Sequence, residues 1–268
     1  MQFRQQALSK LQSPEEMDLP VRFARPQGWL VLIVTVAVLI GASFWAVTGT
    51  VSSTLNAPGI LTHGQGSYIL QSPVAGQVTA VLAEEGQRVA ANTPLLRVRT
   101  GRGTTVVRSL AAGRLTTMVA TIGSVVTTGA DVASVERVAH RGDPLTATLY
   151  VPADNGASVP VGGSVDLTVQ SVPSQQYGVL RGRVKAVGRT AQTRQRIGAY
   201  LGSSQLGEQF SKSGPPVAVL VQLEPAPHNK SGYAWSTSGG PPYAVDSMTL
   251  ASGAVHLAAQ HPIDWLLP

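Results

Sequence analysis

The fold is decided by a stretch that occurs twice, ILQSPVAGQVTAVLAEEGQRVAANTPLLRV at 69–98 and VVRSLAAGRLTTMVATIGSVVTTGADVASV at 106–135. The two copies align without gaps, and the matched residues include Ser72 with Ser109, Gly76 with Gly113, and Gly86 with Gly123. An internal repeat of this kind indicates one structural unit that is used twice.

Each copy predicts short strands separated by turns. The dipeptides Ala75-Gly76 and Ala112-Gly113 mark one turn, and a second turn ends at Gly86 or Gly123. We expect glycine at these turns because it adopts positive φ without strain. One copy cannot bury both faces of its apolar strands, but two copies that face each other can. The repeat therefore predicts a small, flattened β-sandwich.

The first copy also carries a recognisable signature. SPVAGQV at 72–78 and EEGQRV at 84–89 fit the pattern S-P-V-x-G-x-V followed by E-x-G-x-x-V, so region 67–137 resembles a lipoyl/biotinyl-like domain. True carriers hold a modified lysine on the hairpin that links the halves. Here the link RTGRGT at 99–104 has none. The resemblance therefore implies an architectural sandwich without a cofactor, and it excludes a biotin- or lipoate-carrying enzyme subunit.

A membrane span precedes the repeat. Residues 28–47, GWLVLIVTVAVLIGASFWAV, contain no charge, and about 20 apolar residues suffice to cross the hydrocarbon core of a bilayer. Trp29 and Trp45 lie near the two ends, where indole rings favour the headgroup region. The long preceding segment favours an uncleaved anchor over a signal peptide.

The distribution of cations predicts the orientation of this span. Arg4, Lys10, Arg22 and Arg25 precede it, and no further Lys or Arg occurs until Arg88. The positive-inside rule places segment 1–27 in the cytosol and residues from about 49 onward outside the cell (inner) membrane. Although the chain is basic, with a formal charge of +6, this location excludes nucleic acid as a natural partner of the main body.

The cytosolic segment has apolar residues at helical spacing. Phe3, Ala7 and Leu11 fall on one face of a helix. We expect Phe3 and Leu11 either to lie on the inner leaflet or to contact the cytosolic side of a partner.

Residues 138–268 predict a membrane-proximal β-barrel domain, and segment 48–66 predicts a linker followed by the first barrel strand. Three runs read as strands, because 145–151 and 164–169 alternate apolar and polar residues and 217–223 is continuously apolar. We expect 51–62 to pair with them. Only 13% of all residues are charged, against roughly 25% on average, which also suits a β-rich chain with many turns.

Strand 180–186 of this region is basic on one face. Arg181, Arg183 and Lys185 alternate with Leu180, Gly182, Val184 and Ala186, so period two places the cations together. They form either a solvated strand face or a contact for anionic lipid or for an acidic surface of a partner.

Two later segments of the same region allow weaker predictions. Residues 195–201 and 205–210 predict short helical turns within 190–213, whose role the sequence does not indicate. Tyr233 and Trp235 lie in a segment that we expect to be an ordered loop. Their rings either pack on the barrel or contact a partner.

The sequence lacks the motifs by which catalytic and metal-binding sites are commonly recognised. There is no cysteine, and the five histidines do not occur at metal-ligand spacing. Neither a G-x-S-x-G motif nor a Walker A motif occurs. We therefore expect a protein that is not an enzyme and that holds no metal.

Taken together, the anchor, the lysine-free repeat and the barrel resemble the haemolysin-D-type membrane fusion proteins, which are periplasmic adaptors of bacterial exporters. The link at 99–104 has no room for the α-helical hairpin of long members. Further motifs are similar to the secretion proteins of bacteriocin systems that export peptides with nitrile-hydratase-type leaders. They are FRQQALSKLQSPEEMD, LYVPADNGASVPVGGSV, SVPSQQYGVLRGRVKAVG, SGYAWSTSGGPP and PIDWLLP.

The resemblance implies the partners. A peptide-exporting ABC transporter, often with its own peptidase domain, would supply energy and leader cleavage, and several copies of the chain would guide the exported peptide outward. The alternative is an envelope protein that binds or senses a ligand without taking part in transport. That alternative requires a defined pocket with converging polar groups, and the sequence alone does not reveal one.

Overall fold

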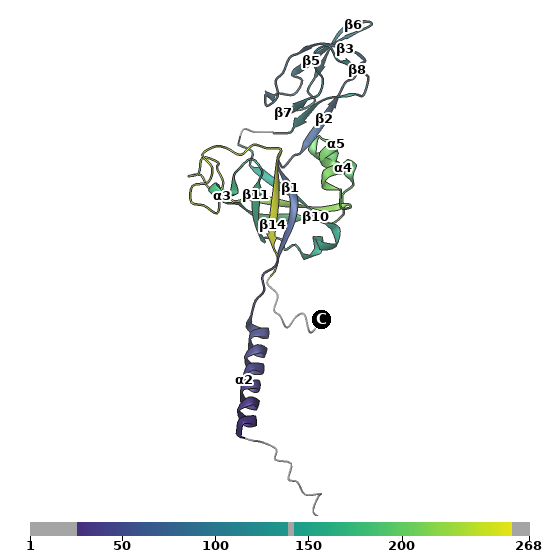
Figure 1. Cartoon of the computed structure of the whole chain (residues 1–268). Helices are drawn as coiled ribbons and strands as arrows, with labels where there is room; N and C mark the ends of the chain where they lie inside the picture. The colour runs from purple at the N-terminus through teal and green to yellow at the C-terminus, as the bar shows by residue number, and fades with distance from the viewer. Residues whose placement is uncertain (1–25, 139–141, 259–268) are drawn as a thin grey trace, which may run out of the picture. The chain divides into compact units, whose positions relative to one another are not determined.

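The computed structural model describes residues 26–138 and 142–258 of the chain. Ser52–Ala259 forms one compact unit, and the N-terminal helix belongs to another. In the described residues the protein is mainly β, with one apolar N-terminal helix, a closed six-stranded barrel and two four-stranded sheets (Figure 1).

The predicted span forms a continuous helix, α2 (Pro26–Thr48). Its segment Gly28–Thr48 has a mean hydropathy of 2.6 and is long and apolar enough to cross a membrane. Trp29 and Trp45 are exposed along it, and 16 residues of helix separate them by about 24 Å. Phe3 and Leu11 lie outside the described residues, as do 259–268.

Residues 67–136 fold into two sheets that enclose one core. Their orders are β2-β9-β7-β4 and β6-β5-β3-β8. The strands are β2 (Ser67–Gln71), β3 (Gly76–Val81), β4 (Arg88–Val89), β5 (Pro94–Thr100), β6 (Gly103–Arg108), β7 (Gly113–Met118), β8 (Val125–Val126) and β9 (Asp131–Glu136).

The two copies of the repeat exchange strands instead of each forming its own sheet. Strands β2 to β5 come from the first copy and β6 to β9 from the second, so each sheet holds two strands from each copy. The repeat symmetry extends to single hydrogen bonds. The amide of Gly86 donates to the carbonyl of Leu115 at 2.7 Å, and the matching amide of Gly123 donates to Val78 at 2.8 Å.

The paired glycines serve two different purposes. Gly86 and Gly123 have φ of 84° and 93°, as expected for turns that require a left-handed residue. The same expectation is wrong for Gly76 and Gly113, whose φ angles lie outside the left-handed region. A Cβ atom at Gly76 or at Gly113 would lie 2.1 Å from a backbone carbonyl oxygen of a neighbouring strand. Glycine is therefore required there by close approach of two backbones.

The link between the copies is a tight hairpin. Thr100 pairs with Gly103, so β5 and β6 are joined by two residues, Gly101 and Arg102. This geometry confirms that no α-helical hairpin is inserted between the halves.

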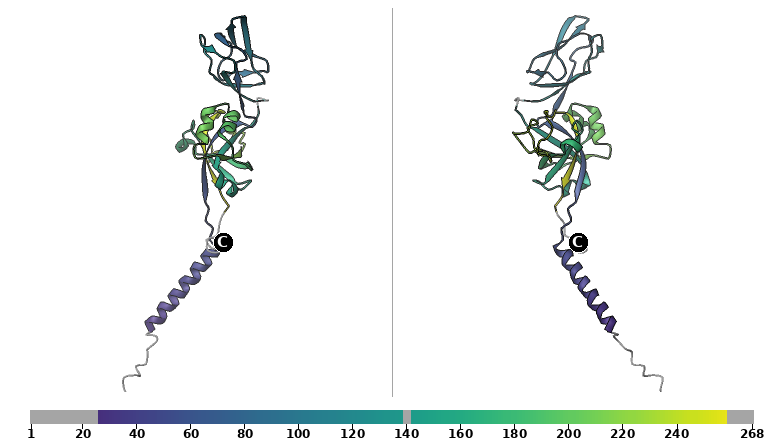
Figure 2. Two further views of the ribbon diagram at one scale, coloured as in Figure 1. Left: turned by 90° about the vertical axis from the view of Figure 1, so that its right-hand side faces the viewer. Right: turned by 60° about the vertical axis from the view of Figure 1, so that its left-hand side comes forward.

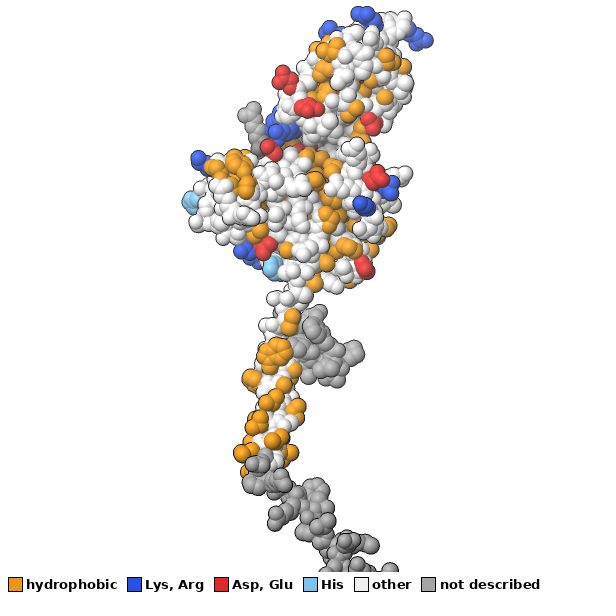
Figure 3. Space-filling view, in the orientation of Figure 1, with side chains coloured by type: hydrophobic (Ala, Val, Ile, Leu, Met, Phe, Trp, Pro, Cys, Tyr) orange, Lys and Arg blue, Asp and Glu red, His pale blue; other side chains and the backbone are white. Residues whose placement is uncertain are grey.

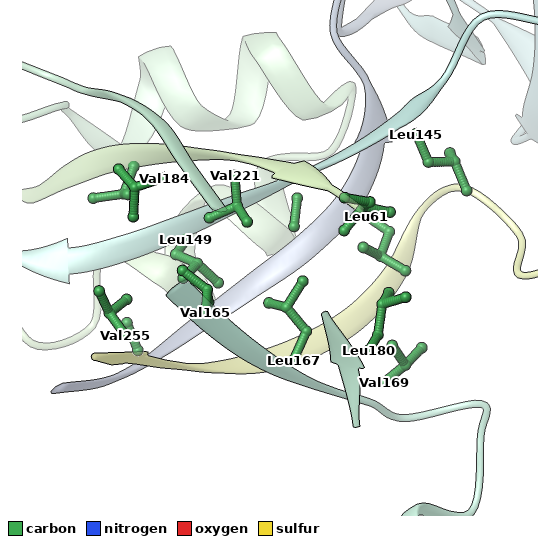
Figure 4. Packing of buried hydrophobic residues seen from close by; sticks show 14 of the residues in the cluster. Leu61, Leu145, Leu149, Val165, Leu167, Val169, Leu180, Val184, Val221 and Val255 are labelled. Carbon is green, nitrogen blue, oxygen red and sulfur yellow. The ribbon is translucent and has the colours of Figure 1, made fainter. Parts of the chain in front are cut away.

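The remaining strands close into a barrel in the order β1-β10-β13-β12-β11-β14. Leu149, Leu167 and Val221 are among the side chains that fill its interior (Figure 4). As expected, the segment after the span pairs with this region, because β1 contacts both β10 and β14. The barrel strands are β1 (Thr54–His63), β10 (Leu145–Pro152), β11 (Ser164–Val169), β12 (Leu180–Val187), β13 (Pro216–Leu223) and β14 (Thr249–His256).

Four short helical segments lie between these strands in the chain. They are η1 (Ala153–Ser158) and α3 (Ser174–Tyr177), together with the pair α4 (Arg194–Leu201) and α5 (Ser204–Phe210). The pair confirms the two helical turns predicted within 190–213. It lies beside the outer face of the barrel (Figure 2). Ile197 and Leu201 pack there in one cluster with Ile60 and Tyr150.

The helix pair α4–α5 packs on the outward face of β10 at Tyr150. The strand predicted at 145–151 is confirmed as β10. Although apolar and polar residues alternate along it, Thr146, Thr148 and Tyr150 are all buried as well.

Candidate functional site

A buried carboxylate joins the two places where the chain crosses between barrel and sandwich. Glu136 ends β9 and His63 ends β1. The backbone amide of His63 donates to Oε1 of Glu136 at 2.8 Å, and the His63 Nδ1 atom lies 2.9 Å from the same oxygen. The Ser247 hydroxyl donates to the other oxygen, Oε2.

These contacts keep Glu136 ionised although its side chain has no exposed surface. Burial alone would raise its pKa, because the charged form loses hydration. The hydrogen bonds from the His63 ring and amide and from Ser247, with the attraction of His63, outweigh burial and lower the pKa below its usual value. The arrangement suits a fixed structural anion.

Further bonds connect the same two crossings. The amide of Arg137 donates to the carbonyl of Gly66 at 2.9 Å, and the Arg137 guanidinium donates to the carbonyl of Gln65. The segment after β9 is therefore tied to the β1–β2 turn by its backbone as well as by the Glu136 carboxylate. No local pattern in the sequence indicates this network, because its members are far apart along the chain.

The basic strand β12 is partly neutralised by acids of neighbouring segments. Arg181 donates to Asp166 at 2.8 Å, and His256 lies 3.0 Å from the other oxygen of that carboxylate. Arg183 donates to Glu224 at 2.9 Å. The structure therefore places Arg181 and Arg183 in ion pairs that the spacing of acids along the sequence does not reveal.

A β-bulge at Lys185 interrupts the expected alternation. The register between β12 and β13 shifts between Val184 and Ala186, so Lys185 is the extra residue. Lys185 is exposed, and Ala186 is exposed as well instead of lying on the inner face with Val184. The prediction for Ala186 is wrong because a bulge reverses the side to which the following residue points.

The two loop aromatics contact the barrel. Trp235 is 7% exposed, belongs to the barrel core and donates through Nε1 to the Ser231 hydroxyl at 2.9 Å. The hydroxyl of Tyr233 accepts from the amide of Leu145 at 2.8 Å, which ties the loop to the start of β10. Packing on the barrel accounts for both rings. Contact with a partner stays a prediction.

Charged side chains are scattered over the surface of the barrel and the sandwich (Figure 3). Among residues 26–138 and 142–258, no group of three or more His, Cys, Asp or Glu side chains lies close enough to hold a metal ion. A pocket outside the barrel, beside Tyr150, is a further feature that the sequence does not indicate.

No protein-family model matches the sequence, and no curated protein matches it either. Solved structures do. ZneB from Cupriavidus metallidurans superimposes with a TM-score of 0.51 at 12% identity, over 78% of this chain and 100% of that one. The two chains share a fold.

Two other matches are looser. MacA from Actinobacillus actinomycetemcomitans has a TM-score of 0.49 at 10% identity, over 80% of this chain and 81% of that one. The membrane fusion protein Spr0693 from Streptococcus pneumoniae R6 has a TM-score of 0.39 at 8% identity, over 75% of this chain and 98% of that one.

Proposed function

We propose that this protein is a membrane-anchored adaptor, a membrane fusion protein, of a peptide- or bacteriocin-exporting ABC transporter. The observation that carries the proposal is a lipoyl-like sandwich whose two-residue hairpin lacks lysine, inserted in a barrel that follows a span-length apolar helix. Such a sandwich cannot serve as a swinging arm. We propose that it serves instead as a building block that contacts other chains.

The proposed arrangement follows from the anchor. Helix α2 lies beside the spans of the transporter in the cell (inner) membrane, with the N-terminal segment in the cytosol. The barrel and sandwich stand outside the membrane, and several copies surround the exit path of the peptide. The chain performs no catalysis, so ATP hydrolysis and leader cleavage belong to the transporter.

The restriction to peptide cargo rests on the sequence motifs that resemble bacteriocin secretion proteins. Lys185 is the cation that we propose for contact with anionic lipid or with the transporter, because it is exposed on the bulge of β12. Arg181 and Arg183 contribute less to this contact, because Asp166 and Glu224 already compensate their charges.

Capture of the tagged full-length protein from membranes of its host in mild detergent tests the proposal. Mass spectrometry then identifies the chains that co-purify, and chemical cross-linking before solubilisation measures self-association. A tagged single-span protein from the same membrane is the control for non-specific recovery. We expect an ABC transporter in stoichiometric amount and cross-linked multimers of this chain.

A strictly monomeric protein without a transporter, in a sample where other membrane complexes survive, contradicts the proposal. That result favours the second candidate, an envelope protein that binds a ligand without transport. The pocket beside Tyr150 is the observation in its favour, because a binding protein requires converging polar groups in a cavity.

A further inference from the structure

The helix pair α4–α5 forms a second, smaller core on the outside of the barrel. The rings of Tyr150 and Phe210 stack with their centroids 4.5 Å apart, and Ile197 and Leu201 pack beside them. These contacts hold α4 at a fixed place next to strand β10. The space between α4 and the outer faces of β12 and β13 is not filled.

That space is a pocket of about 360 Å³, within the range of small-molecule sites. Its floor is apolar and comes from the outward residues of two barrel strands, while α4 and the segment before it supply polar side chains. The lining residues are Thr148, Tyr150, Ala186, Val187, Gly188, Gln192, Arg196, Tyr200, Ala218 and Leu220.

Two hydroxyl groups in this lining are buried without a partner. The oxygens of Thr148 and Tyr150 each expose less than 1 Å², and neither has a hydrogen-bond partner among the described residues. Leaving a buried hydroxyl without a partner is unfavourable, because the group has lost its hydration. Burial, with a smaller contribution from Tyr200, raises the pKa of Tyr150 above its usual range, so its phenol stays neutral and can donate. Thr148 and Tyr150 both line the pocket and lie two positions apart on β10, so the site contains two potential donors without a partner.

The charge of the lining favours an anion. Arg196 is exposed at the pocket, and among the described residues that line it none is acidic. A neighbouring cation on the same helix differs in this respect. Arg194 lies 3.7 Å from Glu208 and does not line the pocket. The two arginines of α4 are therefore a natural matched pair for an experiment.

We propose that this pocket binds a small amphipathic carboxylate. The carboxylate accepts hydrogen bonds from the hydroxyls of Thr148 and Tyr150 and pairs with the Arg196 guanidinium. Because the hydroxyl oxygens are covered, binding requires side chains of the lining to shift as the ligand enters. The short apolar tail of the ligand then lies on Ala218 and Leu220.

This ligand chemistry has two possible sources. A short fatty acid carries a carboxylate on an apolar chain, and so does the carboxyl terminus of a peptide that ends in aliphatic residues. The proposal concerns the shared chemistry and is independent of the proposed adaptor function. A carboxylate from either source would accept hydrogen bonds from the two buried hydroxyls.

Isothermal titration calorimetry on the full chain in lipid nanodiscs tests the proposal, with empty nanodiscs subtracted. The probes are hexanoate and N-acetyl-leucyl-leucine, each compared with its uncharged amide. We expect one carboxylate to bind per chain and the amides to bind at least about tenfold more weakly, because a carboxylate accepts charge-assisted hydrogen bonds. Tighter binding of the dipeptide points to a peptide terminus, and tighter binding of hexanoate points to a fatty acid.

Three variants locate the site. Arg196→Gln removes an exposed charge, and we expect it to weaken carboxylate binding about tenfold, because a charge-assisted contact is lost. Arg194→Gln on the same helix should leave binding unchanged. Ala218→Leu fills the floor of the pocket and should abolish binding, while thermal unfolding verifies that each variant stays folded.

Three results would overturn the proposal. The first is the absence of binding heat for both carboxylates at millimolar concentration. The second is equal binding of carboxylates and amides. The third is an equal response to Arg196→Gln and Arg194→Gln in variants that unfold like the wild type.

Discussion

The Nδ1 atom of His63 lies 2.9 Å from Oε1 of Glu136, whose side chain is completely buried. The two residues end strands β1 and β9, so the contact joins the two crossings between barrel and sandwich. Because Glu136 also accepts bonds from the His63 amide and from Ser247, its negative charge is a structural part of this junction.

Replacing Glu136 tests the role of that charge. We expect Glu136→Gln to lower the free energy of unfolding at pH 7 by about 2 kcal/mol, because hydrogen bonds to a buried charged group are lost. Since the folded-state pKa of Glu136 is lowered, its contribution is present above the unfolded pKa of about 4.3 and is lost as pH falls through the folded value. Chemical denaturation between pH 3 and 7 measures both effects.

The control for this experiment is Glu84→Gln, which removes an exposed carboxylate in a sandwich turn. It should leave the unfolding curve nearly unchanged. If Glu136→Gln keeps the full stability of the wild type at pH 7 and the same acid dependence, the junction does not depend on an ionised Glu136.

The repeat glycines give a second prediction. Gly76→Ala and Gly113→Ala should each destabilise the sandwich by at least about 2 kcal/mol, because the new methyl group collides with a backbone carbonyl. Thermal unfolding of the two variants measures the loss. Their effects should be similar, since the carbonyl stands 2.1 Å from the added Cβ in both copies.

A third glycine serves as the reference for these two. Gly101 in the hairpin has no atom within 4 Å of an added Cβ, so Gly101→Ala should change stability by less than about 0.5 kcal/mol. Equal losses at all three positions would mean that close backbone approach is not the reason for glycine at Gly76 and Gly113.

Trp235 allows packing on the barrel to be separated from contact with a partner. Trp235→Phe removes the bond to Ser231 and should cost about 1 kcal/mol or somewhat more, because the buried hydroxyl of Ser231 loses the indole donor. We expect the variant to co-purify with the same proteins as the wild type. Reduced recovery of a partner by a variant of nearly normal stability would show that the indole contacts that partner.

The absence of cysteine makes the orientation of the span testable with single introduced thiols. Ser213 is exposed on the compact unit Ser52–Ala259, and Ser13 precedes the span. A membrane-impermeant maleimide should label the Ser213→Cys variant in cells or spheroplasts, and the Ser13→Cys variant only after permeabilisation. The opposite labelling pattern would reverse the proposed orientation.

The sequence alone determined the parts of this protein whose signals are local. Helix α2 follows from an uncharged run of sufficient length, and the sandwich follows from a repeat that matches residue for residue. Several strands were predicted closely because alternation and glycine turns are properties of neighbouring residues. The shortness of the link at 99–104 indicates that no α-helical hairpin is inserted, whereas the two-residue turn at Gly101 and Arg102 comes from the structure.

Only the tertiary structure decided how these parts combine. The exchange of strands between the repeat copies, the pairing of β1 with β14 and the cover of α4 and α5 over Tyr150 depend on contacts between distant segments. Glu136 contacts His63 and Ser247 for the same reason. Likewise, Arg181 of β12 donates to Asp166 of the adjacent strand β11. Local propensity carries no information about such partners, because their energy is gained only when the chain has closed the barrel and buried them.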